Sequence, residues 1–149
     1  MKIVNLTLRI AIGASLAASG VIHAYLYIHG YRDIPAVGPA FLLQGSVFCA
    51  LAALVLAGGP AWLQLVAVIG ATGSLAAFAL SRTVGLFGFT ERGWQPAPYA
   101  AITVVAEVLT LLLVGATALR QRPRASKDRP LYQGDVGVTD RSSSPGRPR

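Results

Sequence analysis

"IPAVGPAFLLQGSVFCALAALVLAGGPAWLQLVAVIGATGSLAAFALS", residues 34–81, carries no charged side chain over 48 residues. As one continuous helix this stretch would be about 72 Å long, at about 1.5 Å per residue. The hydrocarbon core of a bilayer is only about 30 Å thick and is crossed by about 20 residues. Gly58-Gly59-Pro60, near the middle, is typical of a turn. The stretch therefore predicts two membrane-spanning helices joined at that turn.

Two further apolar runs flank this stretch, over 10–28 and 97–119, and the second is interrupted only by Glu107. The apolar residues lie on every face, whereas a soluble helix would carry a polar stripe. The runs also lack the alternation of a membrane β-barrel. We expect an all-α, integral membrane, up-and-down four-helix bundle over residues 1–119. Its spans are predicted at about 8–29, 39–57, 61–82 and 98–119.

Residues 120–149 form a segment of different composition, with eight Arg or Lys against three Asp and few large apolar residues. Such a segment buries too little surface to fold alone, so we expect a disordered basic tail. Basic residues next to a span attract anionic lipid headgroups. The predicted lipid contacts are Arg120, Arg122, Arg124, Lys127 and Arg129. Nucleic-acid binding is not expected, since no stacking platform or base-reading element accompanies the charge.

The distribution of positive charge predicts the orientation, because Lys and Arg collect on the cytoplasmic side of membrane proteins. With four spans both termini share one side, which carries Lys2, Arg9 and the tail cluster. On the other side, acids partly offset the arginines (Arg32, Arg82 and Arg92 against Asp33 and Glu91). We expect a bacterial cytoplasmic (inner) membrane protein with both termini cytoplasmic and with loops 29–38 and 83–97 outside. "GASLAASG" at 13–20 resembles a secretory signal, but the apolar run continues through Ile28 and favours an uncleaved first span.

The two histidines do not form a metal motif. His23 and His29 are six residues apart and would point about 120° apart on an unbroken helix. We expect His29 to be a solvated residue at the membrane interface. His23 instead belongs to a row of polar side chains spaced by four residues, which lies on one helix face. Because lipid offers no hydrogen bonds, this face should point into the bundle. The row consists of Ser15, Ser19, His23 and Tyr27.

Glu107 is the second unusual residue, since it lies about ten residues into the fourth span. A carboxylate at that depth costs at least about 2.5 kcal/mol. Thr103, one turn outward, extends the same polar face. We hypothesise a ligand-binding pocket that is open to the outer face, formed by His23, Gln44 and Glu107 and gated by Arg82 and the loops. The alternative interpretation of the same residues is a buried hydrogen-bond network that only fixes helix register. Ser74 is a further candidate partner of Glu107.

Two smaller expectations concern single residues. Glu91 is expected to pair with Arg32 across the outer face, because Arg32 and its neighbour Asp33 would not face each other on a helix. Cys49 has no partner for a disulfide and is expected to be a small buried hydrophobe.

Several segments resemble known membrane proteins. They are "RIAIGASLAASGVIHAYLYIHGYRDIPAVGPAFLLQ" at 9–44, "LSRTVGLFGF" at 80–89, Trp94 and a last span with an embedded Glu. Over residues 9–119 this pattern resembles uncharacterised small four-helix membrane proteins of actinobacteria. It is also loosely similar to the DoxX-like membrane proteins, through Arg9 and a small-residue first span that ends in a polar cluster. The lysine that usually follows the first span in that family is absent, and Tyr31-Arg32 stands nearby.

Three functional classes follow from these features. The leading expectation is a non-enzymatic membrane component that acts by packing with a membrane-protein partner or a second copy, or by binding a small ligand at its outer face. The alternative is a redox-related enzyme or cofactor carrier that binds quinone or haem at the His23 and Glu107 cluster. The sequence does not identify which cofactor, if any, is bound. A transporter would need a polar path through the inner half, where the sequence offers only Thr7, Ser15 and small residues.

Overall fold

A computed structural model describes residues 2–121, and the tail residues 122–149, with the predicted lipid contacts from Arg122 to Arg129, lie outside that part. The described residues form four α-helices: α1 (Lys2–Leu26), α2 (Val37–Leu56), α3 (Trp62–Arg82) and α4 (Tyr99–Gln121). A single turn of π-helix, η1 (Tyr27–Tyr31), continues α1. The expected all-α, four-helix fold is confirmed.

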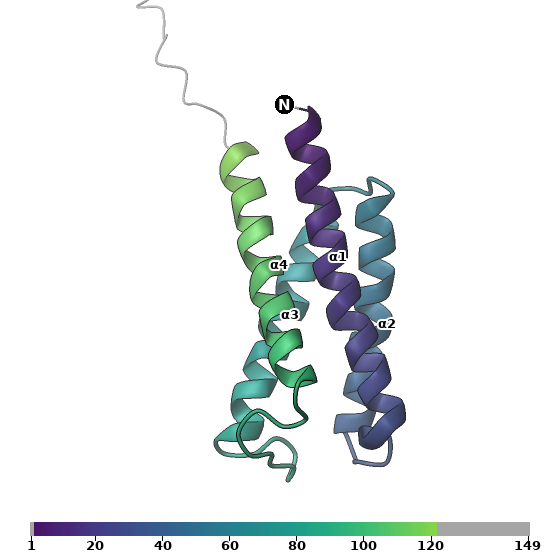
Figure 1. The fold of residues 1–149 in the computed structure, drawn as a ribbon, viewed down its shortest axis with the longest axis vertical. Helices are drawn as coiled ribbons and strands as arrows, with labels where there is room; N and C mark the ends of the chain where they lie inside the picture. Colours follow the sequence, from purple (N-terminus) through teal and green to yellow (C-terminus); the bar gives the residue numbers. More distant parts are fainter. Residues whose placement is uncertain (1, 122–149) are drawn as a thin grey trace, which may run out of the picture.

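The helices run alternately up and down, so that the start of α1 and the end of α4 lie at the same end of the bundle (Figure 1). We call this the terminal end, and we call the opposite end, which carries residues 27–36 and 83–98, the loop end. Helix α1 packs against α2 and α4, and α3 packs against the same two helices. The first and last helices of the chain are therefore neighbours.

All four helices are long and apolar enough to cross a membrane. Large apolar side chains cover their outward faces: Val21, Leu43, Ile69 and Val105 are between 60% and 65% exposed. Exposing such an apolar surface to water would be costly, whereas the hydrocarbon core of a bilayer accommodates it. The backbone groups inside each helix are already hydrogen-bonded within the helix, as a membrane requires. The fold is that of a small multi-pass membrane protein.

The core is apolar towards the terminal end, where Ile12, Leu16 and Phe48 are fully buried. Helices α1 and α2 approach closely at two glycines. A Cβ added to Gly20 would lie 3.1 Å from the Gly45 carbonyl oxygen, and one added to Gly45 would lie 3.1 Å from the Gly20 carbonyl oxygen. Small residues allow such close packing in membranes, where no hydrophobic force drives helices together.

Arg9 joins α1 to the end of α2. Its guanidinium donates hydrogen bonds to the carbonyl oxygens of Val55 (3.3 Å) and Leu56 (2.7 Å) in the last turn of α2, where the Gly58 amide also donates to Val55. The chain then turns at Gly58, whose φ of +87° favours glycine. A cation at the carboxyl end of a helix also interacts favourably with the helix dipole.

The structure differs from the sequence-based expectations in two details. Helix α1 begins at Lys2 rather than near residue 8, because the helical backbone also includes the residues before Arg9 and the apolar run that follows it. The expectation of a buried thiol at Cys49 is wrong, since this residue is exposed on α2.

Candidate functional site

A row of polar contacts joins α1 to α4 inside the bundle. The Ser15 and Thr110 hydroxyls lie 2.8 Å apart, and the Ser19 hydroxyl donates to Oε1 of Glu107 at 3.0 Å. All four residues are buried, and Glu107 is only 1% exposed. We call these contacts the polar seam. The polar seam follows from two local patterns. Ser15 and Ser19 are four residues apart on α1, and Glu107 and Thr110 are three residues apart on α4, so each pair lies on one helix face.

His23 continues the seam towards the loop end. Its Nδ1 lies 2.9 Å from the Ser19 carbonyl oxygen and 3.4 Å from the Ser19 hydroxyl. Because a carbonyl oxygen only accepts hydrogen bonds, Nδ1 must carry the hydrogen in this contact. The second ring nitrogen, Nε2, makes no hydrogen bond within residues 2–121. Ser19 therefore touches both the imidazole and the carboxyl group.

A cavity of about 90 Å³ lies where the seam meets the loop end. All four helices contribute to its walls, as does the segment between α3 and α4. The polar and ionisable side chains in these walls are His23, Tyr31, Ser74, Ser81, Arg82, Glu91, Thr103 and Glu107.

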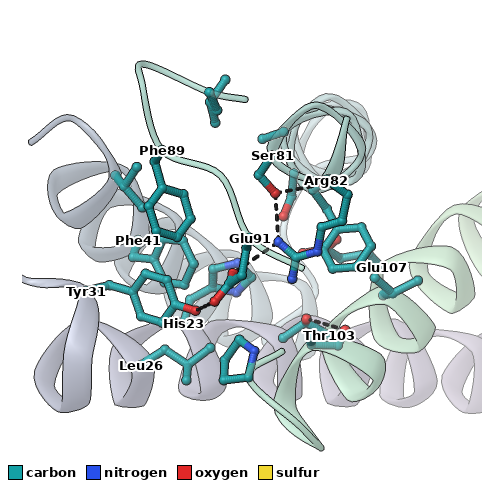
Figure 2. Close-up of a pocket in the computed structure, with 18 residues that line it drawn as sticks. His23, Leu26, Tyr31, Phe41, Ser81, Arg82, Phe89, Glu91, Thr103 and Glu107 are labelled. Atoms are coloured by element: carbon teal, nitrogen blue, oxygen red, sulfur yellow. Dashed lines mark hydrogen bonds and ion pairs between the residues drawn. The ribbon is translucent and has the colours of Figure 1, made fainter. Parts of the chain in front are cut away.

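Three of these residues form a chain of contacts across the cavity (Figure 2). The Arg82 guanidinium donates to Oε2 of Glu91 at 3.0 Å, and the Tyr31 hydroxyl donates to Oε1 of the same carboxylate at 2.5 Å. The Arg82 and Glu91 side chains are only 15% and 19% exposed. We call this set of three residues the latch, because it ties the α3–α4 segment to both α3 and η1.

Backbone hydrogen bonds bring Glu91 to this place. Leu86 and Phe89 pair as a tight turn, with the Leu86 amide donating to the Phe89 carbonyl oxygen at 2.8 Å. The Glu91 amide then donates to the Ser81 carbonyl oxygen at 3.0 Å. This last contact returns the chain to the final turn of α3, directly beside Arg82.

Arg82 also holds the rest of the segment in place. It donates to the carbonyl oxygens of Gly93, at 3.1 Å, and of Gln95, and to the Ser81 hydroxyl at 2.8 Å. Its guanidinium lies 4.2 Å from the centre of the Phe78 ring, a cation–π distance. Most of the hydrogen-bonding capacity of this arginine is therefore used within the protein.

Aromatic rings line the remaining wall. Tyr31 stacks on Phe41, with ring centroids 4.6 Å apart, and meets the edge of Phe89 at 5.9 Å. Phe41 also lies 5.1 Å from the His23 imidazole. The cavity thus combines a polar floor with an aromatic side, which is the usual composition of a small-molecule site.

The structure brings most of the predicted site residues together. His23, Arg82 and Glu107 line the cavity with Thr103, and Ser15 and Ser19 lie deeper in the seam. Gln44 does not line it, because Phe41, one turn nearer the loop end on α2, occupies the space beside His23. The Gln44 amide nitrogen is buried elsewhere without a hydrogen bond.

The remaining predicted residues lie outside the cavity. Tyr27 is half-buried in η1 and does not line the cavity. His29 is exposed, and its Nδ1 contacts the Tyr25 carbonyl oxygen at 2.9 Å. Arg120 is exposed near the end of α4.

Sequence reasoning missed several contributors to the site, Ser81 among them. Thr110 and Tyr31 were not assigned to it, and Glu91 was expected to pair with Arg32, which is wrong. Arg32 instead lies 3.6 Å from Asp33, because both occupy a turn rather than a helix, and this contact is highly exposed. The available signal was that Glu91 is an isolated acid nine residues after an arginine that ends an apolar span.

Among residues 2–121 no group of three or more His, Cys, Asp or Glu side chains is arranged to hold a metal ion. Comparison of the chain with family models, with curated proteins and with solved structures finds no match. The function must therefore be argued from the site itself.

The latch predicts how the α3–α4 segment responds to proteolysis. In Glu91→Ala, Arg82 and Tyr31 lose their shared partner, and the free energy of local opening should fall by about 1 kcal/mol or more. Trypsin cleavage after the exposed Arg92, measured by mass spectrometry in detergent, should then be at least about fivefold faster.

Asp33→Ala is the matched control, because the Arg32–Asp33 contact is exposed and should contribute little. Equal cleavage rates at Arg92 in Glu91→Ala and the unmodified protein would contradict the proposed role of the latch.

Proposed function

We propose that this protein is a non-enzymatic, multi-pass component of the bacterial cytoplasmic membrane that binds a small molecule in the cavity at its loop end. The observation that carries the proposal is the meeting of Glu107 and His23 at one cavity with an aromatic wall. A purely structural network would need the seam alone. The cavity and the latch above it are additional features that such a role leaves unexplained.

The size of the cavity limits the ligand. Drug-sized ligands occupy pockets of about 300–1,000 Å³, and the cavity measures about 90 Å³. It suits a ligand with a small number of non-hydrogen atoms, and a haem is too large for it. Haem carriage is therefore not part of the proposal.

The chemistry of the walls also disfavours a quinone. Quinone carbonyl oxygens accept hydrogen bonds, so a quinone site needs donors. The hydroxyls of Tyr31 and Ser19 already donate to carboxylates, and Arg82 donates to four partners. Small-molecule binding without electron transfer is the function that the geometry supports best.

A cavity-filling variant tests this proposal. Ala77 on α3 lines the cavity, whereas Ala79, two residues later, is exposed on the side of α3 that points away from the bundle. Ala77→Leu should abolish the binding of a co-purified small molecule, detected by native mass spectrometry of protein released from its own membrane. Ala79→Leu should keep that molecule at the level of the unmodified protein.

The fold should tolerate the additional methyl groups of Ala77→Leu because the cavity has room for them, and size-exclusion chromatography would verify this. Absence of any bound small molecule from the unmodified protein, or its unchanged binding in Ala77→Leu, would contradict the proposal.

We further propose that the terminal end faces the cytoplasm. Within residues 2–121 this end carries Lys2, Arg9 and Arg120 without an acid, whereas two of the three arginines at the loop end pair with Asp33 and Glu91. The distribution agrees with the excess of positive charge on the cytoplasmic side of membrane proteins. Arg120 and the basic residues that follow it would contact anionic lipid headgroups there.

Cysteine labelling in intact cells tests this orientation. In a Cys49→Ser background, Val84→Cys at the loop end should react with a membrane-impermeant maleimide in intact cells. Gln121→Cys at the terminal end should react only after lysis. Both positions are exposed, so access depends on the side of the membrane. The reverse pattern would show that the protein is inserted the other way round.

A further inference from the structure

We propose that the ligand of the cavity is a small protonated amine, bound through its ammonium group to Glu107 and His23. This inference rests on the proposed function and names the chemical class of the ligand. It follows from the charges and the hydrogen-bond acceptors that face the cavity.

The charges in the walls do not balance. The cavity is lined by two carboxyl groups, Glu91 and Glu107, one guanidinium, Arg82, and one imidazole, His23. Arg82 pairs with Glu91 at 3.0 Å, and its other hydrogen bonds go to neutral oxygens of the protein. One positive and one negative charge are thereby matched, and Glu107 is left over.

The neighbours of Glu107 are hydroxyl groups. Ser19 donates to Oε1 at 3.0 Å, and Ser74 on α3 is the second hydroxyl beside this carboxyl group. The ion pairs formed within residues 2–121 do not include Glu107. A buried carboxylate without a cation is costly, and a cation that enters the cavity and matches its hydrogen-bonding geometry offsets part of this cost. An anionic ligand would instead meet a carboxyl group that has no free cation beside it among residues 2–121.

His23 adds a second acceptor to the lining of the cavity. Its Nδ1 is held as a donor by the Ser19 carbonyl oxygen, so Nε2 is the nitrogen left to accept a hydrogen bond. A protonated primary amine has three N–H groups and can donate to Glu107 and to His23 at once. A quaternary ammonium has none, so the two acceptors favour an amine that carries hydrogens.

The aromatic wall suits the same ligand. Phe41 and Tyr31 stack face to face, and Phe78 and Phe89 also line the cavity. Aromatic faces attract cations through their quadrupole, and they pack against the apolar part of a small amine. A short amine with a compact apolar or aromatic body matches both the walls and the limited volume.

Three ligands of similar shape and different charge test the inference. Benzylamine, which is protonated at neutral pH, benzyl alcohol and benzoate would be titrated into the full-length protein in detergent by isothermal titration calorimetry, with detergent alone as blank. Benzylamine should bind at least about tenfold more tightly than benzyl alcohol, since charge-assisted hydrogen bonds are roughly twice as strong as neutral ones. Benzoate should not bind.

Glu107→Gln keeps the size of the side chain and an oxygen that accepts from Ser19, but removes the charge. Benzylamine should lose its advantage in this variant, while the affinity for benzyl alcohol stays within about threefold. If the variant does not fold, the relative affinities of the three ligands for the unmodified protein still test the inference.

Equal binding of benzylamine and benzyl alcohol would overturn the amine inference and leave the small-molecule site standing. Tighter binding of benzoate would overturn it as well. Failure of all three ligands to bind would count against both the inference and the proposed function.

Discussion

A carboxyl group buried in the middle of an apolar bundle is the constraint on which the rest of this structure depends. Glu107 cannot face lipid without a large penalty, so α4 must turn that side chain inward. There it meets Ser19 of α1, which donates a hydrogen bond at 3.0 Å. Because lipid offers no hydrogen bonds, this contact favours one rotation of α4 and one register of α4 against α1.

The polar seam in turn determines where the cavity lies. At Ser15 and Thr110 the two helices meet hydroxyl to hydroxyl, at 2.8 Å. One turn further along α1, the Ser19 hydroxyl meets the carboxyl group of Glu107. One turn beyond that, His23 lines the cavity together with Glu107. The latch of Arg82, Glu91 and Tyr31 covers it from the loop end. The seam thus ends in a candidate binding site. There the helix ends and the α3–α4 segment enclose a cavity that is lined by polar side chains.

The parts of this arrangement that depend on local sequence could be predicted. The charge-free stretch at 34–81 predicted two spans, and the spacing of four in Ser15, Ser19 and His23 placed them on one face. A single acid in an apolar span pointed to a buried group. Each of these signals is a periodicity or a composition within one helix, so it needs no knowledge of neighbours.

The parts that depend on contacts between distant segments could not be predicted. The partner of Glu91 depends on a backbone hydrogen bond to Ser81, which no spacing in the sequence reveals. Gln44 was assigned to the cavity by its depth along α2, but the bulk of Phe41 beside His23 decides which α2 residues reach it. Thr110 was missed because threonine is common in membrane helices and forms its own bond to the Ala106 carbonyl oxygen.

Disulfide formation between α1 and α4 tests the central claim most directly. Ser15→Cys and Thr110→Cys would be combined in a Cys49→Ser background, which leaves Glu107 and His23 unchanged. Because the two hydroxyl oxygens lie 2.8 Å apart, the paired sulfurs should be within bonding reach. Mild oxidation in native membranes should give an intramolecular cross-link that forms in the double variant and in neither single one. Failure of the double variant to cross-link would contradict the inward orientation of the seam.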